Sequence, residues 1–214
     1  MKVNLTIGIP SWLDRIFTWP MMVYRRHKYG YSFRRIDLGE GQWTILDQRD
    51  YYRLNNFKWC ISGNGRQFYA IRLAKKGPGQ TKIEYLHRVI MEPKDGLVVD
   101  HKNGDKLDNR RDNLRIATHW QNSCNKPKKQ NTLSRFNGVT LDKRCGRWEG
   151  QIHCNGKRIR LGRFDSEIEA ARAYDAAART YHGEFARLNF PETRTDTDLT
   201  PLDAASLSHG VNTD

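Results

Sequence analysis

An alanine-rich run near residue 175 constrains the fold of this chain more than any other feature of its sequence. Small side chains recur there at helical spacing and give one face of a helix on which only Tyr174 is large. That face consists of Ala170, Ala171, Ala173, Tyr174, Ala177 and Ala178. Because alanine lets a helix approach a neighbouring layer closely, the run predicts a helix packed directly on a sheet. Asp165 or Ser166 is expected to cap it, since residues 166–169 are close to a capping box.

Three short strands are predicted before this helix. Residues 136–140, 147–153 and 157–162 carry the alternating and β-branched or aromatic side chains that strands favour. Asn155-Gly156, between the second and third segments, is typical of a tight hairpin turn. Since the helix covers one face of the sheet, the opposite face is left for a ligand.

The order of these elements and their particular residues resemble the AP2/ERF DNA-binding domain over residues 134–191. The matching residues are Gly138-Val139, Gly146-Arg147-Trp148, Gly156-Lys157, Leu161-Gly162-Arg163-Phe164, the run from Glu169 to Ala178, and Leu188-Asn189-Phe190. The resemblance implies a three-stranded sheet that lies in the major groove of duplex DNA. The positions it assigns to DNA contact are Thr140, Arg144, Gln151, His153, Arg158 and Arg160.

Arg158 and Arg160 are the strongest of these candidates. Strand alternation puts both side chains on one face, and arginine can bind guanine edges or phosphates. The alternative is a solvated strand face that binds nothing. The chain departs from plant members of the family at Asn137, Thr140 and Arg160, so the target sequence of those proteins cannot be transferred to it.

A second constellation begins with adjacent Asp100 and His101 and continues with Asn113 and Asn122. Asp100 can give a carboxylate oxygen to a hard cation such as Mg²⁺, and Asn122 can complete the metal shell. His101 can act as the general base that deprotonates a water molecule. Asn113 can hold the imidazole in the right tautomer through its side-chain oxygen. These residue types are those of a one-metal nuclease site.

This spacing resembles the HNH, or ββα-metal, endonuclease family over residues 85–125. The segments that carry the resemblance are residues 85–91, 100–105, 107–115 and 118–122. It implies the same roles for the four residues named above, and it places His87 beside the site, as a phosphate contact or a brace of the fold. Strands are expected at 97–100 and 114–117. Thr118 with Gln121 predicts a capping box at the start of the helix that carries Asn122.

The N-terminal third is less specific. Residues 1–35 mix basic and aromatic side chains, which suits nucleic-acid backbone and exposed bases; a tail packed on the body is the alternative. Residues 36–84 predict short strands, with hairpin signals at 63–65 and 77–79 and a short helix between Asp47 and Asn55. Three large aromatic residues of this region are expected in the core: Trp43, Trp59 and Phe68.

Composition and charge indicate the class of binding partner and the cellular compartment. The 214 residues carry a net charge of +13, which points to a polyanion because Lys and Arg displace counterions from phosphates; a merely basic surface is the alternative. The four cysteines form no Cys-x-x-Cys pair and are expected to be free thiols, with a Cys145–Cys154 disulfide as a weaker option. No apolar run reaches the roughly 18 residues of a membrane span. A cytoplasmic or nucleoid-associated protein is expected, with a disordered acidic tail at 192–214.

Together these features predict an α+β protein. A basic and aromatic arm at 1–35 is followed by a β-rich lead-in and HNH unit at 36–130, then by an AP2/ERF-like sheet and helix at 131–191. The expected function is that of an HNH homing endonuclease that hydrolyses phosphodiesters with Mg²⁺ or another divalent cation and docks on double-stranded DNA. A monomer or weak dimer is expected. The alternatives are an AP2-type regulator with a relic nuclease unit, and a binder of structured RNA.

Overall fold

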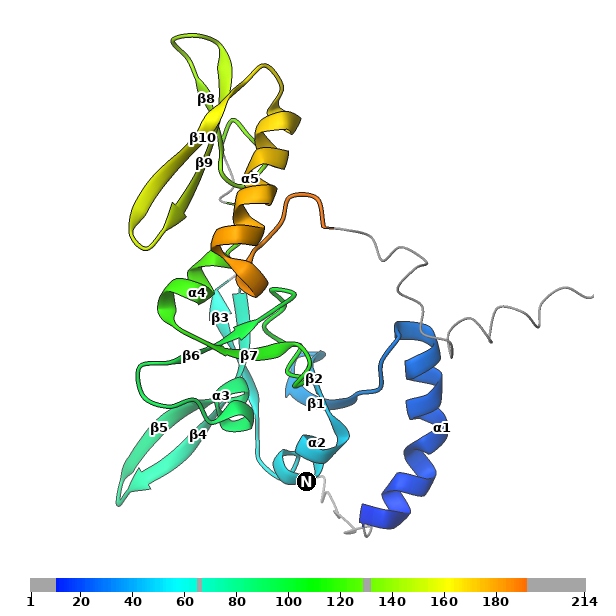
Figure 1. Cartoon of the computed structure of the whole chain (residues 1–214). Helices are drawn as coiled ribbons and strands as arrows, with labels where there is room; N and C mark the ends of the chain where they lie inside the picture. The colour runs from blue at the N-terminus through cyan, green and yellow to red at the C-terminus, as the bar shows by residue number, and fades with distance from the viewer. Residues whose placement is uncertain (1–10, 65–66, 129–131, 192–214) are drawn as a thin grey trace, which may run out of the picture. The chain divides into compact units, whose positions relative to one another are not determined.

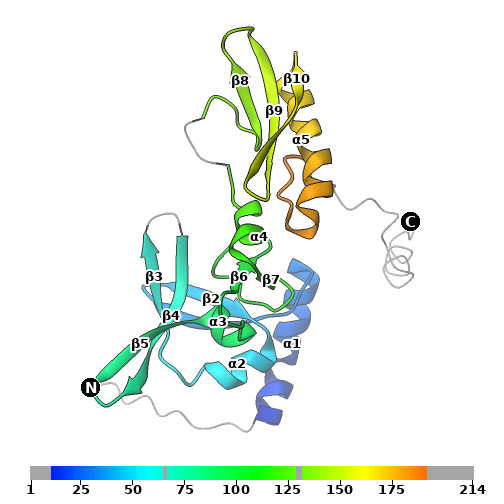
Figure 2. The ribbon, with the colours of Figure 1, turned by 60° about the vertical axis from the view of Figure 1, so that its left-hand side comes forward.

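The computed structural model describes residues 11–64, 67–128 and 132–191 and shows an α+β protein built from small antiparallel sheets (Figures 1 and 2). Contacts between residues divide the chain into two units, the first ending at Pro127 and the second beginning at Lys128. Each unit has its own core. The predicted fold class is therefore found, and each unit can be described by itself.

In its described residues, the first unit contains two helices and five strands up to Tyr85, and two helices and two strands in the predicted nuclease segment that follows. The elements are α1 (Ser11–Tyr29), β1 (Arg34–Gly39), β2 (Gln42–Leu46), α2 (Gln48–Leu54), β3 (Cys60–Asn64), β4 (Gln67–Gly77), β5 (Gln80–Tyr85), α3 (Leu86–Met91), β6 (Val98–His101), β7 (Leu114–Ala117) and α4 (His119–Cys124). They form sheets β1-β2, β3-β4-β5 and β6-β7, all antiparallel.

The core of the first unit joins the lead-in to the predicted nuclease segment. Its buried side chains come from both: Ile36, Leu38, Leu46, Leu54, Trp59, Ala70, Leu86, Ile90, Val99 and Leu114. Trp59 is a core residue, as predicted, but the prediction is wrong for Trp43 and Phe68, which are 48% and 40% exposed. On β2 alternation turns Thr44 and Leu46 inward, so Trp43 faces out and lies under the Arg35 guanidinium, 4.6 Å from its ring centroid. Phe68 lies near the hairpin end of β4, beyond the buried part of that strand.

Several local predictions are confirmed in the first unit. β7 has the predicted bounds, and β6 is shifted by one residue from the predicted 97–100. Thr118 and Gln121 form the predicted reciprocal capping box, because each side chain accepts a hydrogen bond from the backbone N–H of the other. α2 lies between Asp47 and Asn55, although Asp47 does not cap it with its side chain.

The predicted N-terminal arm contains a helix that its sequence did not indicate. Residues 11–29 form helix α1, with Pro20 inside it. The helix is held by Asp14, whose carboxylate pairs with Arg34 at 2.7 Å and accepts a hydrogen bond from Tyr52 at 2.8 Å. Phe17 and Trp19 remain 75% and 66% exposed. Helical periodicity is hard to see in this sequence because aromatic residues occur on every side of the helix.

The second unit is a three-stranded sheet packed on one long helix. Its elements are β8 (Val139–Asp142), β9 (Arg147–Cys154), β10 (Lys157–Phe164), α5 (Glu167–Tyr181) and a short 3-10 helix (Gly183–Phe185). The strand order is β10-β9-β8, and all pairs are antiparallel. The predicted alanine face is the packing face of α5: Ala170, Ala171, Tyr174 and Ala178 are buried, and Ala173 and Ala177 are partly buried.

Turn and cap chemistry sets the ends of these elements. Asn155 and Gly156 both have positive φ, 50° and 75°, as a tight hairpin between β9 and β10 requires. Ser166 caps α5 through a hydrogen bond from the Ile168 backbone N–H. β8 begins at Val139 rather than at the predicted residue 136, because Gly138 has a φ of +69° and lies against the Tyr174 ring.

Three further expectations can be compared with the structure. All four cysteines are free, so the weaker option of a Cys145–Cys154 disulfide is wrong. Among the described residues, no helix is long and apolar enough to cross a membrane. The acidic tail predicted at 192–214 lies outside the described residues.

Candidate nuclease centre and DNA-binding sheet

His101 lies at the end of β6, and its side chain is completely buried. Its Nε2 is 3.3 Å from Oδ1 of Asn109. The Asn109 amide nitrogen donates to the Thr44 hydroxyl at 2.8 Å, and this hydroxyl donates to the Leu107 carbonyl at 2.7 Å. Asn109 and Thr44 are also completely buried. A buried polar relay therefore runs from strand β2 through Asn109 to the imidazole.

The relay fixes the protonation of the ring. Because the Asn109 amide nitrogen is used as the donor to Thr44, its Oδ1 is the acceptor that faces His101. An acceptor at this position favours the tautomer with the proton on Nε2. Nδ1 of His101 is buried and has no hydrogen-bond partner among the described residues. Nδ1 therefore carries the free lone pair and is the basic atom of the ring.

The lead-in positions this relay through backbone hydrogen bonds. The N–H of Ile45 donates to Leu107 at 3.0 Å, and the N–H of Asn109 donates to Ile45 at 2.8 Å. Strand β2 is therefore hydrogen-bonded through its backbone to the loop that follows β6. Sequence reasoning missed Thr44 and Asn109, since nothing in the local spacing pairs residues 65 positions apart. The one available signal was a polar threonine at an inward position of β2.

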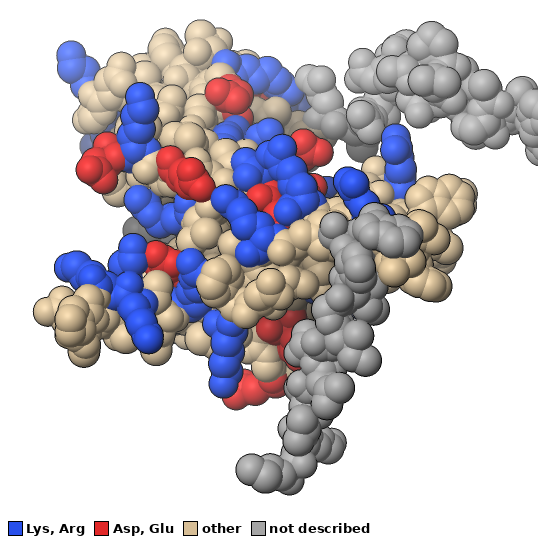
Figure 3. Space-filling model, turned by 90° about the horizontal axis from the view of Figure 1, so that it is seen from below, with Lys and Arg blue, Asp and Glu red and all other residues tan. Residues whose placement is uncertain are grey.

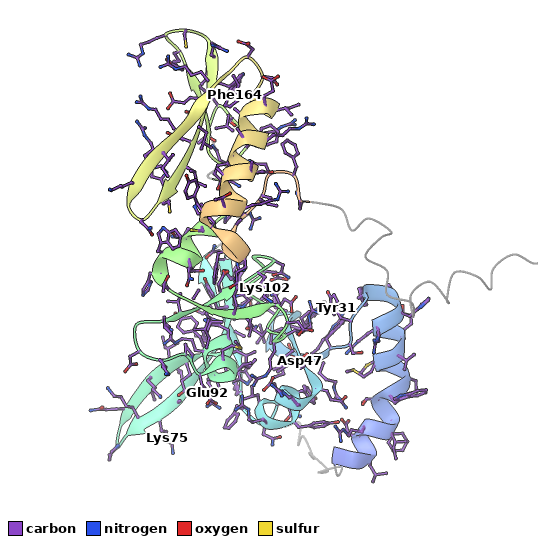
Figure 4. The ribbon with its side chains drawn as sticks, in the orientation of Figure 1. Tyr31, Asp47, Lys75, Glu92, Lys102 and Phe164 are labelled. Carbon is purple, nitrogen blue, oxygen red and sulfur yellow. The ribbon has the colours of Figure 1, made fainter. Side chains whose placement is uncertain are left out.

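Asn113 braces the loop after β6 instead of contacting the imidazole. Its Oδ1 accepts from the Asn103 backbone N–H at 3.0 Å, and its amide nitrogen donates to the Asp108 carbonyl at 2.8 Å. Its own carbonyl accepts from the N–H of Lys102, which follows His101 and is labelled in Figure 4. The expected contact of Asn113 with the ring is thus made by Asn109, four residues earlier.

Burial and neighbouring charge keep His101 neutral. Burial lowers its pKa to about 4, helped by the charge of Lys106 and opposed by the Asn109 hydrogen bond. His87, on α3, contacts it edge to face with ring centroids 5.2 Å apart. Burial lowers the pKa of His87 to about 3. His87 also packs on Tyr69 and Tyr85, so it lies beside His101, and as a buried ring it fits the expected brace better than a phosphate contact.

Asp100 points away from His101, as strand alternation requires, and is 1% exposed. Its Oδ2 accepts from Nε and Nη2 of Arg115 at 2.9 and 2.7 Å. The side-chain amide of Asn125 lies 3.1 and 3.0 Å from the two carboxylate oxygens. Arg115 is directly opposite Asp100 in the β6-β7 register. Sequence reasoning missed both partners, although the cross-strand position of Arg115 could have been inferred from the two predicted strands.

Asn122 is partly exposed on α4, one turn before Asn125, whose side chain reaches Asp100. Carboxylate and amide oxygens are suitable donors for Mg²⁺, which commonly takes one or two carboxylates and fills its shell with water and phosphate oxygens. In the described ranges, no group of three or more His, Cys, Asp or Glu side chains could hold a metal ion. The oxygens of Asp100 and Asn122 are donors of the type that Mg²⁺ takes, but in this structure the Asp100 carboxylate accepts hydrogen bonds from Arg115 and Asn125.

The other candidate residues lie on the face of the second unit's sheet that is turned away from α5. Arg158 is paired with His153, and Arg160 with Gln151, across β9 and β10. Ile152 and Ile159, between them in sequence, pack toward α5. His153, Arg158, Arg160 and Thr140 are exposed, Gln151 is partly exposed, and Arg144 is exposed in the turn before β9. The geometry predicted for this face is confirmed.

Two acidic residues hold the arginines of this face in an extended network. Glu149 pairs with Arg160 at 3.4 Å, and Asp142 pairs with Arg163 at 3.0 Å. The side chains of Arg160 and Arg163 remain 66% and 47% exposed. Sequence reasoning did not select Arg163, because a bulge after Arg160 shifts the alternation of β10 by one residue. Basic side chains also spread over the face of the molecule seen in Figure 3, where acidic ones are fewer.

Comparisons with known proteins match both units. Residues 84–124 match the family model described as HNH endonuclease, and residues 134–184 match that of the AP2 domain. The first match ends at the last residue of α4 and includes His87, His101 and Asn109. The second covers the sheet and helix of the second unit.

The curated relatives share only part of this chain. APETALA2-like protein 2 of Oryza sativa subsp. indica is 50% identical over 70 residues, which are 32% of this chain and 16% of that protein. The AP2-like ethylene-responsive transcription factor TOE2 of Arabidopsis thaliana is 49% identical over 57 residues, 27% of this chain and 12% of that protein. Dehydration-responsive element-binding protein 2A of Oryza sativa subsp. indica is 38% identical over 80 residues, 36% of this chain and 29% of that protein. The chain thus spans less than a third of each relative.

Proposed function

We propose that this protein binds duplex DNA through the sheet of its second unit and hydrolyses a phosphodiester bond at the centre around His101. The DNA-binding part is supported by the AP2 match and by the open, arginine-bearing sheet face. The nuclease part is supported by the HNH match over residues 84–124. The observation that carries it is the buried imidazole whose Nδ1 has no described hydrogen-bond partner.

His101 is the proposed general base. At neutral pH its lowered pKa leaves the ring uncharged, so Nδ1 can accept the proton of the attacking water. The Asn109–Thr44 relay holds the proton already on Nε2. A phosphodiester anion bound beside the ring would favour its charged form and raise its pKa during the proton transfer.

Asp100 and Asn122 are the residues that would hold the cation. A bound Mg²⁺ would supply charge stabilisation for the phosphate and for the leaving 3′ oxygen. The Asp100 carboxylate already accepts from Arg115 and Asn125, so it must exchange partners to hold a cation. Lys106, whose charge lowers the pKa of both His87 and His101, would supply a cation of the chain itself to a phosphate bound beside the ring.

One centre per chain has a consequence for the product. A monomer carries one base and one donor set, so it cuts one strand. A double-strand cut requires a dimer or two successive events. The proposal therefore expects nicked circles before linear product.

A non-cleaving DNA-binding regulator is the second candidate. Two observations favour it: the buried Asp100 carboxylate is paired with Arg115, and the His101 side chain is completely buried. The similarity to an AP2-like ethylene-responsive transcription factor agrees with this candidate. The nuclease unit would then serve only as a folded support.

Conversion of supercoiled plasmid to nicked circles distinguishes the two functions. We expect nicking with Mg²⁺ that EDTA abolishes, and a loss of roughly two to four orders of magnitude in rate for His101→Ala. The matched control is His119→Ala, an exposed histidine at the start of α4, which should cut like the parent. DNA affinity, measured in EDTA, should be unchanged in both variants.

Three results would contradict the proposal. Parent protein that binds DNA but never nicks it favours the regulator. Equal loss of binding and cleavage in His101→Ala indicates a structural role for this residue. Structured RNA that outcompetes duplex DNA of matched length would replace DNA as the partner.

A further inference from the structure

The outer half of the β4-β5 hairpin projects from the first unit as a two-stranded ribbon (Figures 1 and 2). β3 pairs with β4 only as far as Ile71. Beyond this point, residues 72–77 of β4 pair only with residues 80–84 of β5 among the described strands. We call residues 72–84 the ribbon.

The ribbon has two unlike faces. On one, Arg72 pairs with Glu84 at 2.7 Å and Lys82 pairs with Glu84 at 2.8 Å, while the Arg72 guanidinium lies 3.9 Å from the centroid of the Phe57 ring. This face is fixed to the body of the unit. On the other, Leu73 and Ile83 are directly opposite each other and are 68% and 56% exposed.

Exposed aliphatic pairs on a free two-stranded ribbon are costly, because they invite pairing with other chains. The ribbon's charge indicates what it pairs with. It contains four basic residues and one acidic residue. Lys75 and Lys76 are exposed near its far end, where Figure 4 labels Lys75. A second copy of the ribbon would carry the same positive charge and repel the first.

We propose that the ribbon is a second DNA-binding element, which enters a groove of the duplex. The major groove accepts a two-stranded ribbon. Lys75 and Lys76 would bind phosphates, and Leu73 and Ile83 would contact the apolar part of base edges, such as thymine methyl groups. This inference rests on the DNA binding of the proposed function, not on cleavage.

The position of the ribbon in the chain links it to the candidate centre. β5 ends at Tyr85, and α3 begins at Leu86. His87, the second residue of α3, is in ring contact with His101. DNA held by the ribbon is therefore held by an element that continues directly into the buried centre. The AP2-like unit would select the site, and the ribbon would fix the duplex on the nuclease unit.

The test compares two double variants of the full chain that lose the same charge. Lys75→Ala/Lys76→Ala removes two ribbon lysines, and Lys58→Ala/Lys94→Ala removes two exposed lysines elsewhere in the first unit. Affinity for duplex DNA is measured in EDTA over a range of salt. We expect the ribbon variant to lose about tenfold or more in affinity, with the slope of log Kd against log salt reduced by about two, and the control to change much less.

A third variant, Leu73→Ser/Ile83→Ser, tests the apolar pair. We expect weaker DNA binding with an unchanged salt slope, and unchanged folding because both side chains are exposed. Ribbon lysine variants that bind like the control pair overturn the proposal. A Leu73/Ile83 variant with parental DNA affinity but altered sedimentation would assign the ribbon to self-association. Weakened binding of structured RNA alone would assign it to RNA. None of these results depends on nicking, so the failure of the two proposals can be told apart.

Discussion

The two candidate regions differ in the burial of their polar side chains. Around His101 and Asp100 they are buried and bonded to one another, with almost every donor and acceptor assigned to a partner. On the β8-β9-β10 sheet the arginine side chains reach into solvent and pair with acids on the same face at 3.0 to 4.0 Å. The first arrangement fixes geometry and protonation; the second offers charge to a partner.

This difference separates what each region contributes. A buried charge or imidazole is coupled to folding, because the unfolded chain returns it to water. An exposed arginine contributes little to folding and much to binding of a polyanion. Substitutions around His101 and Asp100 should therefore change stability and chemistry, and substitutions on the β8-β9-β10 sheet should change DNA affinity.

Acidification should have the largest effect, which is a loss of stability in the first unit. The folded-state pKa values of about 4 for His101 and about 3 for His87 lie below the ordinary 6.5, so the folded unit binds fewer protons than the unfolded chain. Their stabilisation is complete above pH 6.5 and is lost as the pH falls through 6.5 toward 4. For His101 alone the loss is on the order of 3 kcal/mol.

Urea unfolding of the full chain, followed by peptide-resolved hydrogen exchange with correction for intrinsic rates, measures this loss. Peptides of residues 84–124 should lose protection between pH 7 and pH 5. His101→Gln should flatten the pH dependence, and His119→Gln should leave it as in the parent. A first unit equally stable at pH 7 and pH 4.5 would contradict the burial of two neutral histidines.

Removal of the Asp100 carboxylate should have the next largest effect. Asp100→Ala leaves the Arg115 guanidinium, whose side chain is only 12% exposed, without its carboxylate, and removal of one partner of a buried pair costs about 3–5 kcal/mol. The control is Asp165→Ala in the second unit, where the pair with Arg147 is 85% and 46% exposed. That change should cost at most about 1 kcal/mol.

Urea midpoints of the two variants check this prediction. The double variant Asp100→Leu/Arg115→Met should recover most of the loss, since a well-packed apolar pair can replace a buried ion pair. If Asp100→Ala and Asp165→Ala cost the same, the Asp100–Arg115 pair is not a buried structural element. In that case only the cation-binding role of Asp100 would remain.

The sequence predicted the second unit better than the first. Strand alternation, the Asn155-Gly156 turn and the alanine face of α5 are local signals, and each acts within a few residues. The bulge after Arg160 is the main miss, because a bulge depends on how β9 and β10 pair. Arg163 was overlooked for that reason.

In the first unit the elements were predictable, but their contacts were not. Local patterns predicted β7 and the Thr118 capping box, and they singled out the adjacent Asp100 and His101. The relay from Thr44 to Asn109 depends on the pairing of β2 with a loop more than sixty residues away, which no local pattern encodes. Resemblance to a family suggested Asn113 as the partner of the imidazole, and only the three-dimensional contacts pointed to Asn109.

Removal of arginines from the sheet should have the smallest effect. Its effect on DNA affinity distinguishes a base contact from a phosphate contact. Arg158→Ala or Arg160→Ala should weaken DNA binding by about 1–3 kcal/mol if a base edge is lost, and only for the preferred sequence. If a phosphate contact is lost, the weakening should be uniform across sequences and the salt slope should fall by about one. Arg160 is paired with Glu149 at 3.4 Å, whereas Arg158 forms no ion pair among the described residues. Arg160 must therefore exchange its partner on binding and should contribute less. Affinities for preferred and scrambled duplexes over a salt series measure all three quantities, and nicking at saturating DNA should remain parental. A double variant that binds both duplexes like the parent at physiological salt would remove the sheet from the interface, and the open face would then have to be explained as a solvated surface.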